Sequence, residues 1–259
     1  MQKNKIIKKV IEISQKAGDH AKNNFCEDGY KYESKSQTQD VTKIDKECEE
    51  IILSELKKIS DEFKIISEED INSHNQEIID DEYYWIVDPL DGTTNFRSGI
   101  KNFANQIALV QNNNVILGCI YLPFENKVLH AIENQGSYCN DSQLNINHVH
   151  TTGNSLMNLE SYLDEYDLKN LEKIRKEFKY VYSINSAVSS FAHFALGKTH
   201  LVYSCCDQPW DVAAGILIAK EAGATISTPD NQLVDLFNPK IIASSSKELH
   251  EKVIELLKK

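Results

Sequence analysis

Residues 85–96 read Trp-Ile-Val-Asp-Pro-Leu-Asp-Gly-Thr-Thr-Asn-Phe, a short apolar run that stops abruptly at Asp88 and Asp91. Pro89 fixes its own φ angle and has no N–H donor, so we expect the chain to turn where this strand ends. Both aspartates and the carbonyl of Leu90 then converge on one side of the turn. The stretch therefore predicts a strand whose last residues hold carboxylates against a crevice.

The residues after this turn favour a ligand site. Gly92 permits a backbone conformation close to a ligand, and Thr93 with Thr94 can begin a helix. Free N–H groups at such a helix start suit a phosphate. The competing interpretation is that Asp88 and Asp91 only cap a turn, because these are common turn residues.

Carboxylates follow apolar runs at three further places. These are residues 67–70 (Ser-Glu-Glu-Asp), 210–211 (Trp-Asp) and 40–45 (Asp-Val-Thr-Lys-Ile-Asp). Polar residues at strand ends are held rigidly and face the crevice where open α/β sheets bind ligands. We therefore expect these acidic strand ends to gather at one site.

The spacing of apolar residues predicts mixed secondary structure in the first half. Helical spacing favours helices near 6–17 and 46–60, with a loop or hairpin over 26–40 between them. Alternating patterns then predict an antiparallel meander. The strands of this meander are 105–111, 114–122, 127–133 and 136–140, and they follow two short apolar runs, 63–70 and 83–96, that each end in acidic residues.

Strands and helices alternate beyond residue 150, which predicts layers of α and β structure. We expect one domain over 1–259, because no linker or repeat divides it, with subhalves of about 1–145 and 146–259. The expected helices are 168–178, 187–197, 210–223 and a closing helix, and the expected strands are 179–184, 199–204, 224–227 and 240–246.

Composition limits the classes of function. The 259 residues carry 28 Lys and Arg against 39 Asp and Glu, a net charge of −11. This makes nucleic acid an unlikely main ligand, although carboxylates that hold divalent cations can still bind a phosphorylated substrate. No apolar run approaches the ~18–20 residues that span a bilayer, and no secretory signal is visible. Six cysteines without C-x-x-C spacing indicate reduced thiols and a cytoplasmic protein.

Two motifs carry a family resemblance. Residues 85–96 together with 208–223 (Gln-Pro-Trp-Asp-Val-Ala-Ala-Gly-Ile-Leu-Ile-Ala-Lys-Glu-Ala-Gly) resemble the inositol monophosphatase family of Mg²⁺-dependent phosphatases. The upstream stretches 40–45 and 66–70 fit the same family in the same order. The resemblance implies a layered αβαβα sandwich, a frequent homodimer, inhibition by Li⁺ and a hydrolase that acts on phosphoric monoesters.

The same resemblance implies roles for individual residues. Thr93 corresponds to the residue that orients the attacking water, Asp45 to its acidic partner, and Lys35 to a position near a third, loosely held metal. The resemblance implies that Glu68 is both a catalytic residue and a ligand of Mg²⁺. The implied ligands of two to three Mg²⁺ ions are Glu68, Asp88, the Leu90 carbonyl, Asp91 and Asp211.

A second group of residues is implied in substrate binding. Inositol-specific members have an acidic residue seven positions before the aspartate of the Trp-Asp motif, and this chain has Ser204 there. A hydrogen bond to a charged acceptor contributes about 1.5–3 kcal/mol against 0.5–1.5 for a neutral one, so we expect a broader phosphatase. The alternative is that Asp207 or a neighbouring loop takes the place of the acidic residue. The implied substrate contacts are Asp91, Gly92, Thr93, Thr94, Asn185, Ser186, Ala187 and Ser204.

We therefore expect a Mg²⁺-dependent phosphomonoesterase for inositol monophosphate or a related small polyol or sugar phosphate. The alternatives are a 2′- or 3′-nucleotide or NADP-type phosphatase, and a regulatory binding protein that keeps the fold. Other groupings predict structure rather than chemistry: Ser189, Ser190 and His193 as packing residues of a helix, residues 205–207 as a strand end, and the two tryptophans as core anchors.

Overall fold

The computed structural model describes residues 2–29, 43–70, 81–146, 151–161, 165–205 and 208–258. The predictions for Lys35, Asp40 and most of the 26–40 loop lie outside these residues. So do residues 206–207 at the predicted strand end.

The first half of the chain forms two helices on one face of a seven-stranded sheet, the first sheet. Strand β1 runs parallel to β2, and all later neighbours in the order β1 to β7 are antiparallel, which confirms the predicted meander. The elements are α1 (Lys3–Asn23), α2 (Lys43–Ile59), β1 (Lys64–Ser67), β2 (Tyr83–Asp91), α3 (Thr93–Arg97), β3 (Ala104–Gln111), β4 (Asn114–Leu122), β5 (Lys127–Ile132), β6 (Ser137–Cys139) and β7 (Ser142–Gln143).

The second half forms a five-stranded sheet, the second sheet, in the order β11-β12-β10-β8-β9. Strands β8, β9 and β10 are parallel, and β12 runs antiparallel to β10 and β11. The elements are η2 (Thr152–Asn154), β8 (Leu156–Ser161), α4 (Glu165–Arg175), β9 (Tyr180–Tyr182), α5 (Ala187–Ala195), β10 (Leu201–Cys205), α6 (Pro209–Glu221), β11 (Thr225–Ser227), β12 (Lys240–Ser244) and α7 (Lys247–Leu257). Strand β8 was not among the predicted strands.

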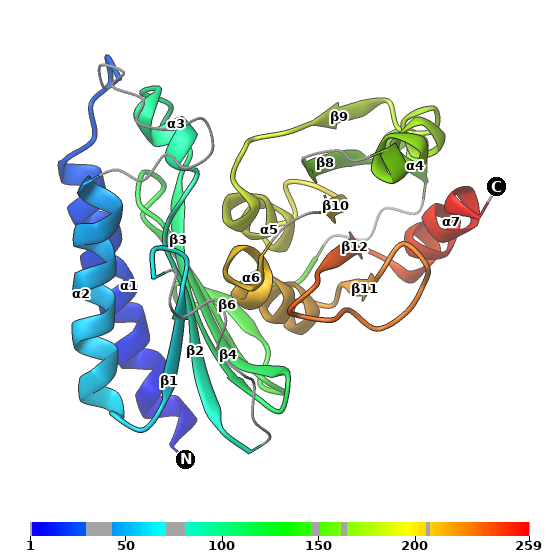
Figure 1. Cartoon of the computed structure of the whole chain (residues 1–259). Coiled ribbons are helices and arrows are strands. Elements are labelled where there is room, and N and C mark those ends of the chain that lie inside the picture. The colour runs from blue at the N-terminus through cyan, green and yellow to red at the C-terminus, as the bar shows by residue number, and fades with distance from the viewer. Residues whose placement is uncertain are drawn as a thin grey trace.

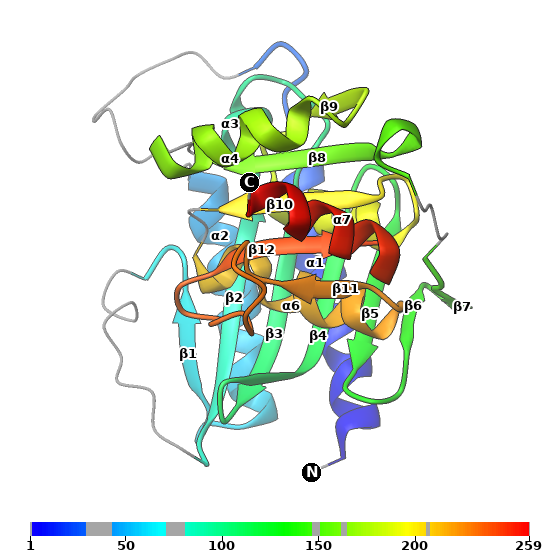
Figure 2. The same ribbon diagram turned by 90° about the vertical axis from the view of Figure 1, so that its right-hand side faces the viewer.

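Figure 1 shows the layers in order: α1 and α2, the first sheet, α5 and α6, the second sheet, then α4 and α7. Turned by 90°, the molecule presents α4 and α7 lying across the second sheet (Figure 2). This arrangement confirms the predicted αβαβα sandwich. No helix in the described part of the chain is long and apolar enough to cross a membrane.

The two halves use helices of different character. The outer helix α1 is amphipathic, with Ile7, Val10, Ile13 and Ala17 buried at helical spacing against the first sheet. Helix α6 is apolar on all sides, because it lies between the sheets and packs on β2 to β5 and on α5. It is the helix that carries Asp211 between the two sheets.

Small residues let α6 approach its neighbours closely. A Cβ atom on Gly215 would lie 2.6 Å from the Cβ of Phe191 in α5. A Cβ atom on Gly118 of β4 would lie 3.0 Å from the Cα of Ala214. A larger side chain at Gly118 would push α6 away from the first sheet, and one at Gly215 would push it away from α5; either change would move Asp211.

Candidate active site

Asp88 and Asp91 lie in the last residues of β2, but the expected turn is an irregularity within the strand. Strand β2 continues to Asp91, and its pairing with β3 shifts between Asp88 and Asp91. The shift occurs where Pro89 has no N–H for the ladder. The N–H of Leu90 instead donates to Oδ1 of Asp88 at 3.0 Å, and Asp88 is fully buried.

Asp211 lies within the predicted helix 210–223, and the prediction that it also marks a strand end is wrong. Asp211 is in the first turn of α6, two residues after Pro209, and its carboxylate accepts the N–H of Gln208. An acidic residue is favourable there because the helix N-terminus carries partial positive charge. Asp88, Asp91 and Asp211 each offer an oxygen, and these atoms lie within 4.8 Å of one another. A sheet and a helix thus build the carboxylate cluster together.

Glu68 is placed beside this cluster by strand pairing. Ser67 of β1 lies opposite Val87 of β2, and the N–H of Glu68 donates to the Val87 carbonyl at 3.2 Å. Glu68 is therefore the neighbour of Asp88 across the two strands, and its charge adds to the rise in the pKa of Asp88. The structure brings the four predicted carboxylate ligands into one region.

Burial raises the pKa of all four groups, and repulsion between the carboxylates adds to the rise at Glu68, Asp88 and Asp91. Desolvation is the largest cause in each case, and it holds the pKa of Glu68 and of Asp88 well above the usual range. It raises the pKa of Asp91 to about 7, with Asp211 adding to the rise, and the pKa of Asp211 to about 6. Carboxylates in this arrangement retain protons unless cations compensate their charge. Hard oxygen donors at this spacing fit Mg²⁺.

Thr93 and Asp45 form the expected pair. The Thr93 hydroxyl lies 3.0 Å from Oδ1 of Asp45 and 3.1 Å from the carbonyl oxygen of Leu90. Asp45 is in the first turn of α2, not at a strand end as predicted, and it is only 1% exposed. Because the Leu90 carbonyl reaches Thr93, it faces the site as the sequence suggested.

The predicted substrate segments meet around Asp91. Gly92 has a left-handed φ of +86°, and a Cβ atom there would lie 3.2 Å from the Cβ of Ser186. The Ser186 hydroxyl donates to Asp91, and the N–H of Val188 donates to Oδ2 of Asp91 at 2.9 Å. Residues 92–94 and 185–187 therefore border the same place, with Ser186 as the cap of α5. The roles proposed for Thr94, Asn185 and Ala187 stay predictions.

Ser204 occupies β10 and is fully buried. The parallel pairing of β8 and β10 places it opposite Glu160, a buried carboxylate that the sequence analysis did not single out. The alternation of apolar and polar residues within 156–161 is the sequence signal for this strand.

Gln106 is a second residue that the sequence analysis missed. It lies opposite Asp88 in the pairing of β2 with β3. Its buried carboxamide donates to the carbonyl of Trp210 and accepts the N–H of Ala214 at 2.8 Å. Gln106 therefore ties the first turn of α6, and with it Asp211, to the strand beside Asp88.

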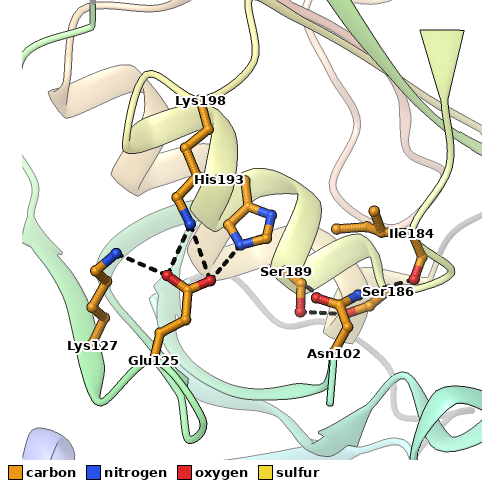
Figure 3. A network of polar contacts seen from close by, with 8 residues as sticks. All are labelled: Asn102, Glu125, Lys127, Ile184, Ser186, Ser189, His193 and Lys198. Atoms are coloured by element: carbon orange, nitrogen blue, oxygen red, sulfur yellow. Dashed lines mark hydrogen bonds and ion pairs between the residues drawn. The ribbon is translucent and has the colours of Figure 1, made fainter. Parts of the chain in front are cut away.

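The weaker groupings have structural roles. His193 lies on α5, as predicted, and its Nε2 is 2.7 Å from Oε1 of Glu125 (Figure 3). Ser190 donates to Glu160 at 2.8 Å. Ser190 and His193 therefore bond to different carboxylates and not to each other. Cys205 is buried at the end of β10, and both tryptophans are buried, as expected for core anchors.

Comparison with known proteins adds independent information. The model of the inositol monophosphatase family matches residues 2–259. A fructose-1,6-bisphosphatase/inositol-1-monophosphatase of Thermotoga maritima is 29% identical over 217 residues, which cover 84% of this chain and 82% of the relative. The Nus factor SuhB of Vibrio cholerae is 30% identical and covers 84% of this chain and 82% of its own length. The crystal structure of extragenic suppressor protein suhB from Bartonella henselae superposes with a TM-score of 0.86 at 29% identity and 98% coverage of both chains.

Proposed function

The chain belongs to the inositol monophosphatase family, and from that premise we propose that it is a Mg²⁺-dependent phosphomonoesterase for inositol monophosphate or a related small polyol or sugar phosphate. Membership makes the protein a phosphoric monoester hydrolase. The observation that carries the metal dependence is the approach of Asp88, Asp91 and Asp211 within 4.8 Å, with Glu68 alongside.

Each group of residues has a distinct task in this proposal. Glu68, Asp88, the Leu90 carbonyl, Asp91 and Asp211 would hold the ions. When bound, Mg²⁺ compensates the carboxylate charge, acidifies a water molecule and stabilises the leaving oxygen. The Thr93 hydroxyl donates to the buried Asp45, which fixes its orientation and leaves its lone pairs free to accept from the attacking water. Asp45 and Thr93 therefore position the nucleophile without themselves bonding to phosphorus.

The test of the proposed function is phosphate release by the purified protein, with and without Mg²⁺. We expect hydrolysis of inositol 1-phosphate that is abolished by a chelator and restored by added Mg²⁺. Millimolar Li⁺ should inhibit this hydrolysis. Absence of any phosphate release from polyol, sugar and nucleotide monophosphates would contradict the proposal and favour a regulatory protein that keeps the fold.

Substrate breadth follows from Ser204. Ser204 lies beside Glu160 and is uncharged, whereas inositol-specific members have an acidic residue at this position. The site therefore has one carboxylate fewer to accept hydrogen bonds from inositol hydroxyls. We expect activity on inositol 1-phosphate, glycerol 2-phosphate and 2′-AMP alike. A relative whose name couples a sugar bisphosphatase with an inositol monophosphatase supports this breadth. We would compare kcat/KM for the three substrates in wild type, Ser204→Glu and the uncharged control Ser204→Gln. A strict inositol preference that Ser204→Glu leaves unchanged would contradict it.

Three further properties belong to the same proposal. We expect a homodimer, a cytoplasmic location and a chain that unfolds as one domain. Light scattering after size exclusion would measure the first property. Calorimetry would test the last, because one domain gives a single transition whose calorimetric and van't Hoff enthalpies agree.

A further inference from the structure

Glu160 is a buried carboxylate outside the proposed ligand set. It lies on β8 and is 6% exposed. Its Oε1 accepts the N–H of Ile184 at 3.0 Å and the hydroxyl of Ser190 at 2.8 Å, with the Ser183 hydroxyl at 3.5 Å. The donors that these contacts supply are all uncharged, and all come from the segment between β9 and the first turn of α5.

The peptide of Ile184 is held from both sides. Glu160 takes its N–H, while its carbonyl accepts from the carboxamide of Asn95 at 2.7 Å and from that of Asn102 at 3.0 Å. Figure 3 shows Asn102 reaching this carbonyl beside Ser186. The turn before α5 is therefore fixed to the second sheet through Glu160 and to the first half of the chain through the two asparagines.

This turn leads directly to Asp91. The Ser190 hydroxyl that contacts Glu160 also lies 2.8 Å from the carbonyl of Ser186. Ser186 and the N–H of Val188 both contact Oδ2 of Asp91, so two donors of the α5 N-terminus determine where that carboxylate points. A continuous set of contacts thus runs from Glu160 to a proposed cation ligand.

The negative charge of Glu160 is unfavourable at this position, so it is not the reason for a carboxylate there. Burial raises the pKa of Glu160, and its proximity contributes to the raised pKa of Asp91. What a carboxylate offers at this position is acceptor capacity, because one oxygen can take several donors at once. A buried polar group of this kind is tolerated where its hydrogen bonds are made.

We propose that Glu160 is a positioning residue for the cation site: it fixes the Ile184–Ser190 segment so that Ser186 and Val188 hold Asp91 in place for cation binding. The inference rests on the proposed cation site and adds a residue to it. Glu160 touches neither cation nor substrate in this account and acts only through α5.

The experiment is calorimetric titration of the metal-free protein with Mg²⁺ alone. We expect Glu160→Ala to weaken Mg²⁺ binding about tenfold, the lower end of the range for groups that orient metal ligands. Glu160→Gln keeps an oxygen that accepts the same donors, so we expect its Kd to match that of wild type within about 1.5-fold. Wild-type Mg²⁺ binding by Glu160→Gln would show that the site depends on the hydrogen-bond acceptor of Glu160 and not on its negative charge.

Glu221 supplies the matched control. It is a carboxylate that accepts two backbone donors of another turn, the N–H groups of Asn134 at 2.8 Å and Gly136 at 2.7 Å. It lies at the far end of α6 from Asp211, about 15 Å along the helix axis. Glu221→Ala should lower the Tm without changing the Mg²⁺ titration.

If Glu160→Ala does not fold, Ser190→Ala still tests the inference, because it removes only one of the hydrogen bonds that Glu160 accepts. We expect it to weaken Mg²⁺ binding about threefold. Wild-type titrations for Glu160→Ala and Ser190→Ala, or equal weakening in Glu221→Ala, would overturn the inference. A wild-type protein that does not bind Mg²⁺ would instead overturn the cation site itself, and this inference with it.

Discussion

Helix α5 meets the first sheet at both of its ends, by opposite chemistry. At the N-terminal end, uncharged donors from Ser186 and Val188 contact the partly buried Asp91. At the C-terminal end, His193 and Lys198 contact Glu125 in the turn after β4, at 2.7 and 2.8 Å (Figure 3).

The two carboxylates respond in opposite directions. Burial raises the pKa of Asp91 to about 7. At Glu125 burial also acts to raise the pKa, but hydrogen bonds from Lys127, Lys198 and His193 outweigh it and lower the pKa to about 2. The site end of α5 therefore holds a charge that the protein does not compensate, whereas the other end is already neutralised. The contacts of Glu125 anchor the C-terminal end of α5, away from the carboxylate cluster. At the N-terminal end, Asp91 can still bind a cation.

The largest effect is expected from removing a charged ligand at the site end. Asp88→Asn and Asp211→Asn keep the side-chain shape but lose a negative charge from the cluster. We expect Mg²⁺-dependent phosphate release to fall to a few per cent of the wild-type rate or less. Substantially higher activity in either variant would show that the cluster is not the metal centre.

Thr93→Ala tests water positioning separately from metal binding. It removes the hydroxyl that contacts Asp45 but leaves every proposed ligand in place. We expect kcat to fall about 100-fold, the lower range for loss of a group that handles a proton, with a much smaller change in the Kd for Mg²⁺. Parallel losses in both quantities would make Thr93 a structural residue instead.

The raised pKa values predict how the stability of the metal-free protein depends on pH. The pKa of Asp91 rises from 3.8 to about 7 and that of Asp211 from 3.8 to about 6, so the folded state binds more protons than the unfolded state between these values. Their stabilisation is complete below pH 4 and is lost as the pH rises to 7. We expect the Tm in EDTA to fall by about 5 °C between pH 5 and 8, relative to the Tm in saturating Mg²⁺.

Taking the difference between the Tm in EDTA and the Tm in Mg²⁺ removes a contribution of opposite sign to the pH dependence of stability. Burial lowers the pKa of four histidines, so their contribution to stability increases with pH over the same interval. It cancels in the difference between the two curves, because these side chains lie outside the ligand set. Parallel EDTA and Mg²⁺ curves would contradict a cation at Asp91 and Asp211. The histidines are His130, His193, His200 and His250.

The smallest effect is expected at the other end of α5. Glu125→Gln removes the charge that Lys127, Lys198 and His193 share, and because the pair is partly solvated we expect a loss of about 1 kcal/mol or less. High salt should reduce this difference further, while kcat and Mg²⁺ affinity stay at the wild-type values. A large loss of activity would show that the two ends of α5 are not independent.

Features formed by residues close together in the sequence could be predicted, and features formed by residues far apart could not. The Asp88–Thr93 unit is local, so its residue types and spacing were visible at once. Asp211 and Glu68 were assigned through the family resemblance, and the structure placed them near Asp88 through α6 and β1. Glu160 was missed because the donors that give it a role lie 23 to 30 residues later.

Gln106 shows the same limit over a longer separation. Within 105–111 it is one more polar residue in an alternating strand. Its partners, Trp210 and Ala214, lie 104 and 108 residues further along the chain. A single sequence contains no signal that joins these positions. The error about Asp211 has a different origin, since an apolar run before an acidic residue is common to strand ends and to buried helix starts.

The burial of α6 on every side has a consequence for biosynthesis. The face of the first sheet that α6 covers is complete once residue 143 has left the ribosome, yet α6 ends at residue 221. For the intervening 78 residues of synthesis, apolar side chains such as Ala108, Ile120 and Leu129 remain without their partners. At the usual rate of about 5–20 residues per second, this interval lasts several seconds, long enough for a chaperone to bind the nascent chain. The helix that completes the acidic site thus also ends the period in which the growing protein is most prone to aggregate.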